Sequence, residues 1–162
     1  MTGTEKNKLK VEVISDLEVK LTRMFEAPRE LVFEAFTTPK HIERWWGLRR
    51  TKTRVDVLDL RVGCRWRFVE IADDGEEYAF RGEFREIVPP EKLVYTFEYE
   101  GEPGQIVVDT LMFEDLGGRT KMTAIALFQS VEDRDGMIDA GMEFGAGESY
   151  DQLDELLEKI QG

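Results

Sequence analysis

Apolar and polar side chains alternate along most of the chain between residues 17 and 128. A period of two places successive side chains on opposite faces of a strand, so each alternating run predicts a strand with one apolar face. Glycine and proline interrupt these runs at short intervals, which is typical of an antiparallel meander. The predicted strands are Leu17–Met24, Val55–Leu58, Cys64–Val69, Tyr78–Arg85, Leu93–Tyr99, Ile106–Phe113 and Lys121–Phe128.

A helical period of apolar residues follows the first of these strands and returns at the end of the chain. Pro28 suits the start of a short helix, because its φ is fixed and it lacks an N–H. Pro39 ends that helix and begins a second one, which closes at Gly47. From Glu132 to Ile160, one broad apolar stripe predicts a single C-terminal helix about 40 Å long.

This order of elements predicts an α+β fold in which a curved antiparallel sheet of about seven strands wraps around a helix. The chain supplies one strand, then two short helices, then six strands, and only the C-terminal helix is long enough to cover the sheet. A sheet that grips a helix leaves room for a cavity between them. Residues 1–16 are expected to form a partly ordered N-terminal tail before a single domain.

The chain is strongly acidic. Its 162 residues include 22 Lys and Arg against 34 Asp and Glu, a formal net charge of −12. This charge would repel nucleic-acid backbones and anionic membranes, so neither is an expected partner. No apolar stretch approaches the roughly 18 residues of a membrane span, and the N-terminus lacks the apolar segment of a secretory signal. We therefore expect a cytoplasmic protein with no membrane span.

The sequence does not contain the residues that several kinds of functional site require. The chain has one histidine, His41, and one cysteine, Cys64, too few for a zinc site of the usual kind or for an internal disulfide. No nucleophile-elbow, dinucleotide-binding or phosphate-binding motif follows a predicted strand. We therefore assign no metal, no cofactor and no catalytic residue. Any enzymatic activity would use carboxylates, tyrosines or lysines in a pocket.

An apolar, aromatic-rich set of residues is the main candidate for a ligand site, because ligand pockets are lined by such side chains with a few polar groups. The alternative is that these side chains fill a solid core. The candidate ligand-binding residues are Trp45, Trp46, Trp66, Phe68, Tyr78, Phe80, Phe84, Tyr95, Phe97, Asp109, Leu111, Met137, Gly141, Met142 and Gly145.

Two members of this set carry more specific hypotheses. Asp109 shares an apolar strand face with Leu111, where a carboxylate of raised pKa would act as a general base or a ligand anchor. The alternative is a solvated position at the strand edge. Gly141 is expected to lie inside the long helix and to border the cavity. A leucine at this position would then grow into empty space and leave the stability equal or improved.

One basic cluster stands out in this acidic chain. It consists of Arg49, Arg50, Lys52 and Arg54. One hypothesis is that the cluster steers an anionic ligand toward the cavity entrance. The alternative is a solvated loop whose cations pair with acidic neighbours.

Motifs along nearly the whole chain resemble the family of activators of the heat-shock protein 90 ATPase. These segments are Pro28–Phe36, Trp45–Gly47, Arg61–Arg67, Gly82–Val94, Gly141–Gly145 and Tyr150–Leu156. That family belongs to the superfamily of START domains and pollen allergens (SRPBCC). The resemblance implies a helix-grip fold for residues 17–162, with a deep hydrophobic cavity that holds lipids, polyketides, hormones or drugs.

The resemblance and the aromatic set together predict that the protein binds a small hydrophobic ligand, lipid- or polyketide-like, without catalysis. One alternative is a cyclase- or dehydratase-like enzyme that uses Asp109 and cavity tyrosines. Another is a stress-related co-chaperone that activates a heat-shock ATPase, with that chaperone as its partner. An exposed strand face or tryptophan would support a homodimer.

Overall fold

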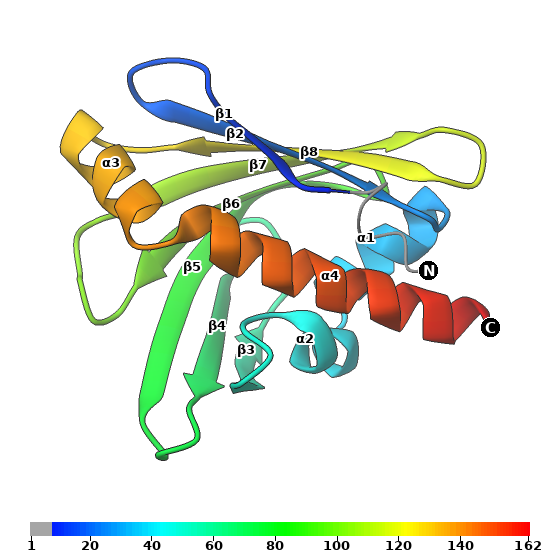
Figure 1. Ribbon diagram of the computed structural model, residues 1–162, viewed down its shortest axis with the longest axis horizontal. Coiled ribbons are helices and arrows are strands. Elements are labelled where there is room, and N and C mark those ends of the chain that lie inside the picture. Colours follow the sequence, from blue (N-terminus) through cyan, green and yellow to red (C-terminus); the bar gives the residue numbers. More distant parts are fainter. Residues whose placement is uncertain (1–7) are drawn as a thin grey trace.

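The computed structural model describes residues 8–162. In these residues eight antiparallel strands form one open sheet in the order β1-β2-β8-β7-β6-β5-β4-β3 (Figure 1). The strands are β1 (Lys10–Val13), β2 (Glu18–Phe25), β3 (Lys52–Leu58), β4 (Arg65–Ile71), β5 (Glu77–Val88), β6 (Lys92–Tyr99), β7 (Val107–Asp115) and β8 (Thr120–Leu127). The helices are α1 (Arg29–Thr37), α2 (Pro39–Trp45), α3 (Val131–Asp139) and α4 (Met142–Gln161). None of these helices is long and apolar enough to cross a membrane.

The predicted α+β fold is confirmed, with one strand more than expected. The additional strand, β1, lies in the segment 1–16 that we expected to be a partly ordered tail, and it pairs with β2 from Lys10↔Thr22 to Val13↔Val19. Only two of its four residues are apolar, so its alternation is too short to stand out in the sequence. Residues 1–7 of that tail lie outside the described residues.

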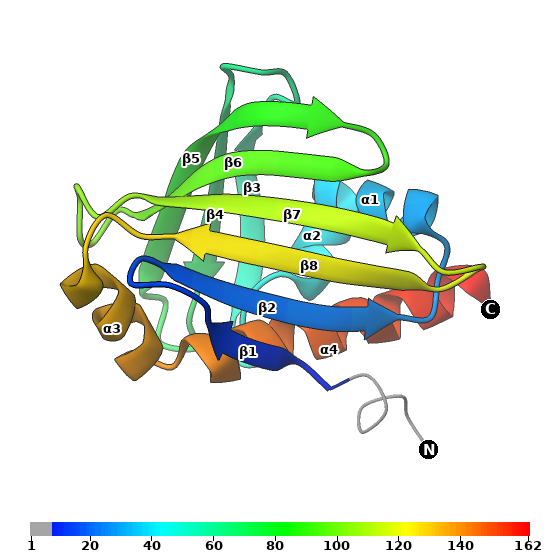
Figure 2. The ribbon, with the colours of Figure 1, turned by 90° about the horizontal axis from the view of Figure 1, so that it is seen from above.

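The prediction of one continuous C-terminal helix was wrong, because the helix breaks at Gly141. This residue has φ +96°, a left-handed conformation that cannot continue a right-handed helix, and it caps the N-terminus of α4. The first backbone hydrogen bond of α4 runs from the N–H of Gly145 to the carbonyl of Gly141 at 2.9 Å. The apolar stripe therefore continues across two helices, and α3 lies at one end of the sheet, beyond α4 (Figures 1 and 2).

Helix α4 runs along the concave face of the curved sheet (Figures 1 and 2). Its most deeply buried residues lie in its C-terminal half. Its buried residues are Leu153, Leu156 and Leu157, which join the main hydrophobic core. The guanidinium of Arg23 on β2, 1% exposed, faces the same half of the helix and pairs with Asp151 at 2.9 Å and Asp154 at 3.7 Å. A buried arginine without these partners would be strongly destabilising, so the ion pairs fix where the helix docks.

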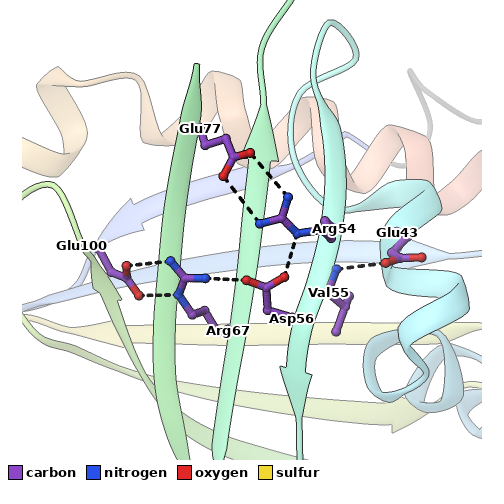
Figure 3. Close-up of polar contacts among 7 residues, drawn as sticks. All are labelled: Glu43, Arg54, Val55, Asp56, Arg67, Glu77 and Glu100. Carbon is purple, nitrogen blue, oxygen red and sulfur yellow. Dashed lines mark hydrogen bonds and ion pairs between the residues drawn. The ribbon is translucent and has the colours of Figure 1, made fainter. Parts of the chain in front are cut away.

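The edge strand β3 is shielded from further strand pairing. A bulge interrupts its register with β4 between Val55 and Val57. The backbone N–H of Val55 donates to the Glu43 carboxylate on α2 at 2.9 Å, so it is not available to another strand (Figure 3). Beside it, Arg67 joins Glu100 to Asp56, so that charged side chains cover this outer surface (Figure 3). The opposite, concave surface of these strands is apolar and faces α4.

The left-handed conformation of Gly141 predicts opposite effects for two glycine-to-alanine substitutions in the same region. Gly141→Ala places a Cβ in the disfavoured conformation and should destabilise the protein by about 1–2 kcal/mol. Gly145→Ala lies inside α4, where a Cβ meets no atom within 4 Å, and should stabilise by about 0.5–1 kcal/mol. Urea unfolding of both variants measures the difference. An equal change in the two unfolding free energies would contradict the helix break.

A cavity between the sheet and the C-terminal helix

A cavity of about 600 Å³ lies between the concave face of the sheet and the N-terminal half of α4. Every predicted ligand-binding residue except Gly141 lines it. These residues are Trp45, Trp46, Trp66, Phe68, Tyr78, Phe80, Phe84, Tyr95, Phe97, Asp109, Leu111, Met137, Met142 and Gly145. The placement of Gly141 was wrong, because the helix break turns this residue out to solvent. The expected growth of a leucine at Gly141 into the cavity was also wrong, because a side chain other than glycine is strained at φ +96°.

Three of the five α4 residues that line the cavity are small, and they lie between the larger Met142 and Tyr150. Gly145, Ala146 and Ser149 border it from successive turns of the helix, whereas the leucines that fill the core begin only at Leu153. A Cβ added at Gly145 would meet no atom within 4 Å. The gap between sheet and helix is therefore a consequence of which residues stand at these positions.

Aromatic rings form most of the far wall. Trp66 lies 4.7 Å from Phe68 between ring centroids, and Trp46 packs edge-on against Phe68 at 5.2 Å and Phe80 at 5.3 Å. Trp45, the neighbour of Trp46, is 2% exposed and donates its indole N–H to the carbonyl of Ala35 at 2.9 Å. The two adjacent tryptophans therefore diverge, one anchored on α1 and the other packed against the sheet.

The turn after the tryptophans is fastened to α4. The Gly47 N–H donates to the Ser149 hydroxyl at 3.0 Å, and that hydroxyl donates to the Gly47 carbonyl at 2.8 Å. The side-chain amide of Gln152 donates to the same carbonyl at 2.8 Å. These three hydrogen bonds join the cavity wall to the middle of the helix, so the turn and the helix hold each other in place.

Glu70 on β4 supports this turn and was missed from the sequence. Its carboxyl group is buried against Gly47 and hydrogen-bonded by the hydroxyls of Thr51 and Thr53, and burial raises its pKa although these bonds act the other way. Each hydroxyl also faces a backbone carbonyl but has only one proton to donate. The alternation of β4, which places Glu70 on the face of Trp66, was the signal.

Asp109 on β7 lies inside the cavity rather than in bulk solvent. Its remaining accessible surface borders the cavity, and burial raises the pKa of its carboxyl to about 7. Tyr95 is its direct partner on β6, and Tyr150 approaches from α4. Burial, together with the negative charge of Asp109, raises the pKa of both tyrosines. Sequence reasoning missed Tyr150, although its position three residues before Leu153 places both on one helix face.

The basic cluster is divided between ion pairs and the mouth of the cavity. Arg49 pairs with Glu155 on α4 at 3.1 Å, and Arg54 pairs with Asp56 at 2.7 Å and with Glu77 at 3.4 Å (Figure 3). Lys52 is exposed and lies outside the cavity lining. Arg50 is exposed and borders the cavity, as does Tyr78, 42% exposed. These two residues mark the mouth.

The packing of Glu70 against Gly47 predicts the effect of a substitution there. A Cβ at Gly47, with φ +98°, would overlap the Glu70 carboxylate, whereas one at Gly63, with φ +86°, would meet no atom within 4 Å. We expect Gly63→Ala to destabilise by about 1 kcal/mol through backbone strain alone. Gly47→Ala should lower the free energy of unfolding by about 3 kcal/mol, because the neighbouring carboxylate must also move. Equal losses in urea unfolding would contradict the described contact.

The raised pKa of Asp109 predicts a pH-dependent stability. Because its folded pKa of about 7 lies above the unfolded value of about 3.9, the folded state binds the proton more tightly. Stability from this group is therefore complete below about pH 4 and is lost as pH rises through 7, by up to about 4 kcal/mol. In Asp109→Asn this loss should disappear, so the free energy of unfolding of the variant should increase relative to that of the wild type as pH rises. Urea unfolding between pH 4.5 and pH 8, with the exposed Glu114→Gln on the same strand as control, measures it. Parallel curves for wild type and Asp109→Asn would refute the assignment.

Comparisons with known proteins agree with this architecture. A protein of Arthrobacter aurescens is 26% identical and superposes with a TM-score of 0.86, covering 93% of this chain and 91% of that one. A protein of Rhodobacter sphaeroides, 22% identical, covers 93% and 98% with a TM-score of 0.87, and an AHSA1 protein of Silicibacter pomeroyi, 19% identical, covers 88% and 99% with 0.72. The latter two show the fold alone.

The family is shown by the sequence itself. No curated protein has a significant match to this chain. The family model described as "Activator of Hsp90 ATPase homolog 1-like protein" matches residues 26–158, which include α1, α2 and most of the sheet and of α4. The resemblance noted in the sequence is therefore confirmed, and the chain belongs to the family of activator of Hsp90 ATPase homolog 1-like proteins.

Proposed function

We propose that this protein binds a small hydrophobic molecule in the cavity between the sheet and α4. The observation that carries the proposal is the cavity itself, about 600 Å³ in volume, with aromatic and aliphatic walls and few polar groups. Its size falls within the range of roughly 300–1,000 Å³ in which proteins hold small molecules. Domains of this fold commonly bind hydrophobic ligands, which agrees with the proposal.

The loss of packing around the cavity supports the proposal that a ligand binds there. Removing packed atoms from a core destabilises a protein by about 24 cal/mol per Å³ of the cavity left behind. In a cavity of about 600 Å³ with largely apolar walls, the side chains of those walls lack packing partners on one side. An apolar molecule that fills the space would recover part of this free energy as binding energy.

The geometry favours binding over the enzymatic alternative. A general base works best when a neighbour orients it and the proton it removes lies within hydrogen-bond reach. Asp109 lies near Tyr95 and Tyr150, but within residues 8–162 no side chain or backbone group hydrogen-bonds to its carboxyl. The cyclase- or dehydratase-like hypothesis therefore lacks the Asp109–tyrosine hydrogen bond that it requires. Activation of a heat-shock ATPase would act through the surface and would not need a cavity.

The proposal is tested by filling the cavity from the helix. Gly145→Leu should place its side chain in the empty space, leave the melting temperature equal or higher, and weaken binding of the fluorescent probe N-phenyl-1-naphthylamine at least about tenfold, through overlap with the probe. Gly147→Leu is the matched control, because it lies on the same helix with open space around it but does not line the cavity.

Three outcomes separate the possibilities. Probe binding that is lost in Gly145→Leu and kept in Gly147→Leu supports the cavity as the binding site. Equal probe binding by both variants, with unchanged melting temperatures, would place the probe elsewhere and count against the proposal. Absence of saturable binding by the wild-type protein would overturn it.

A further inference from the structure

Three polar groups meet on the wall of the cavity. Asp109 and Tyr95 lie directly opposite each other on β7 and β6, and Tyr150 reaches the same cavity from α4, with its ring 6.3 Å from that of Trp45. All three side chains line the same cavity, and the negative charge of Asp109 contributes to the raised pKa of both tyrosines. In the part of the chain that the structure describes, none of the three side chains makes a hydrogen bond.

A carboxylate in such a place lacks a donor. Buried polar groups in folded proteins almost always have hydrogen-bond partners, and an ionised carboxylate only accepts. The other cavity carboxyl, Glu70, has the hydroxyls of Thr51 and Thr53. Asp109 has no such hydroxyl donors, although it also lies among apolar side chains such as Leu111 on the same strand, which is 2% exposed. The Asp109 carboxyl is accessible from the cavity and accepts no hydrogen bond from a described protein group, so a molecule in the cavity can supply a donor to it.

The charges around the cavity favour a cation as that group. Among the described lining residues, Asp109 and Glu70 are acidic, and Arg50, at the exposed mouth, is the one that carries a positive charge. Arg23 lies behind Tyr150, but it is already paired with Asp151 and Asp154. The chain as a whole has a net charge of −12, which attracts cations and repels anions.

A protonated amine would satisfy all these features. Its N–H groups would donate to the Asp109 carboxylate and to the hydroxyl oxygens of Tyr95 and Tyr150. The aromatic walls would take an apolar body and interact favourably with the positive charge through their ring faces. We propose that the ligand is a hydrophobic amine, whose protonated nitrogen lies beside Asp109 and whose apolar body lies among the rings of the sheet. This inference rests on the proposed function of the cavity.

The test uses three probes that share one ring system and differ only in their polar group. These probes are 1-naphthylmethylamine, 1-naphthalenemethanol and 1-naphthoic acid, and their binding is measured by isothermal titration calorimetry at pH 8 and pH 5. At pH 8 the amine should bind about tenfold more tightly than the alcohol, as a charge-assisted hydrogen bond allows, and the acid should bind most weakly. At pH 5, where Asp109 is protonated, the preference for the amine should fall to about twofold or less.

Two variants assign the preference to Asp109. Asp109→Asn should bind the alcohol as the wild type does and lose the preference for the amine at pH 8. Glu114→Gln, which removes an equal charge from the exposed face of the same strand, should keep it. The groups that face Asp109 are Tyr95 and Tyr150, whose pKa values are raised away from this range, and Arg23, which is paired with Asp151 and Asp154. Glu70 also borders the cavity, and its contribution remains in Asp109→Asn.

Failure of this inference is distinct from failure of the proposed function. If alcohol and amine bind equally well to the wild type, or if Asp109→Asn keeps the preference, the cavity is a ligand site but the amine inference is wrong. If the acid binds most tightly, Arg50 at the mouth selects the ligand and the inference is also wrong. If none of the three probes binds the wild type, the proposed function itself loses its support.

Discussion

Helix α4 buries its leucines in its C-terminal half and leaves space under its N-terminal half, and this asymmetric docking determines where the core ends and the cavity begins. Leucines in its C-terminal half enter the core, and the buried guanidinium of Arg23 pairs with Asp151 and Asp154 on that same half. Between Met142 and Tyr150, the N-terminal half presents only the small residues Gly145, Ala146 and Ser149 to the cavity, so space remains under it. A packed core and an open cavity therefore exist side by side under one helix.

The remaining contacts keep this arrangement rigid. The turn at Gly47 is hydrogen-bonded to Ser149 and Gln152 on α4 and packed against Glu70 on the sheet, so it joins the two sides of the cavity at mid-helix. A break in the helix at Gly141 lets the chain turn away where the sheet ends. The contacts of the Gly47 turn with α4 thus bound the cavity at the middle of the helix. The change of chain direction at Gly141 bounds it at the N-terminal end of α4.

Much of this fold follows from local patterns, and the exceptions have identifiable causes. Period-two alternation predicted seven strands, and Pro39 marked a helix start, because both signals depend on neighbouring residues. The break at Gly141 was missed since a glycine inside an apolar stripe does not reveal its φ. Asp109 was recognised as a carboxylate on an apolar strand face, and the same argument applied to β4 would have found Glu70. That Tyr95 lies opposite Asp109 depends on the register of β6 and β7, and that Tyr150 reaches the same cavity depends on how α4 docks, neither of which a local pattern contains.

A ligand retained through purification would be direct evidence that this cavity binds a small molecule. Native mass spectrometry of the protein isolated from the cells that make it, compared with the denatured chain, would detect such a molecule. The account predicts an additional small-molecule mass in the native spectrum that disappears on denaturation. A native spectrum with the mass of the bare chain alone, under conditions that preserve a known hydrophobic complex, would contradict it.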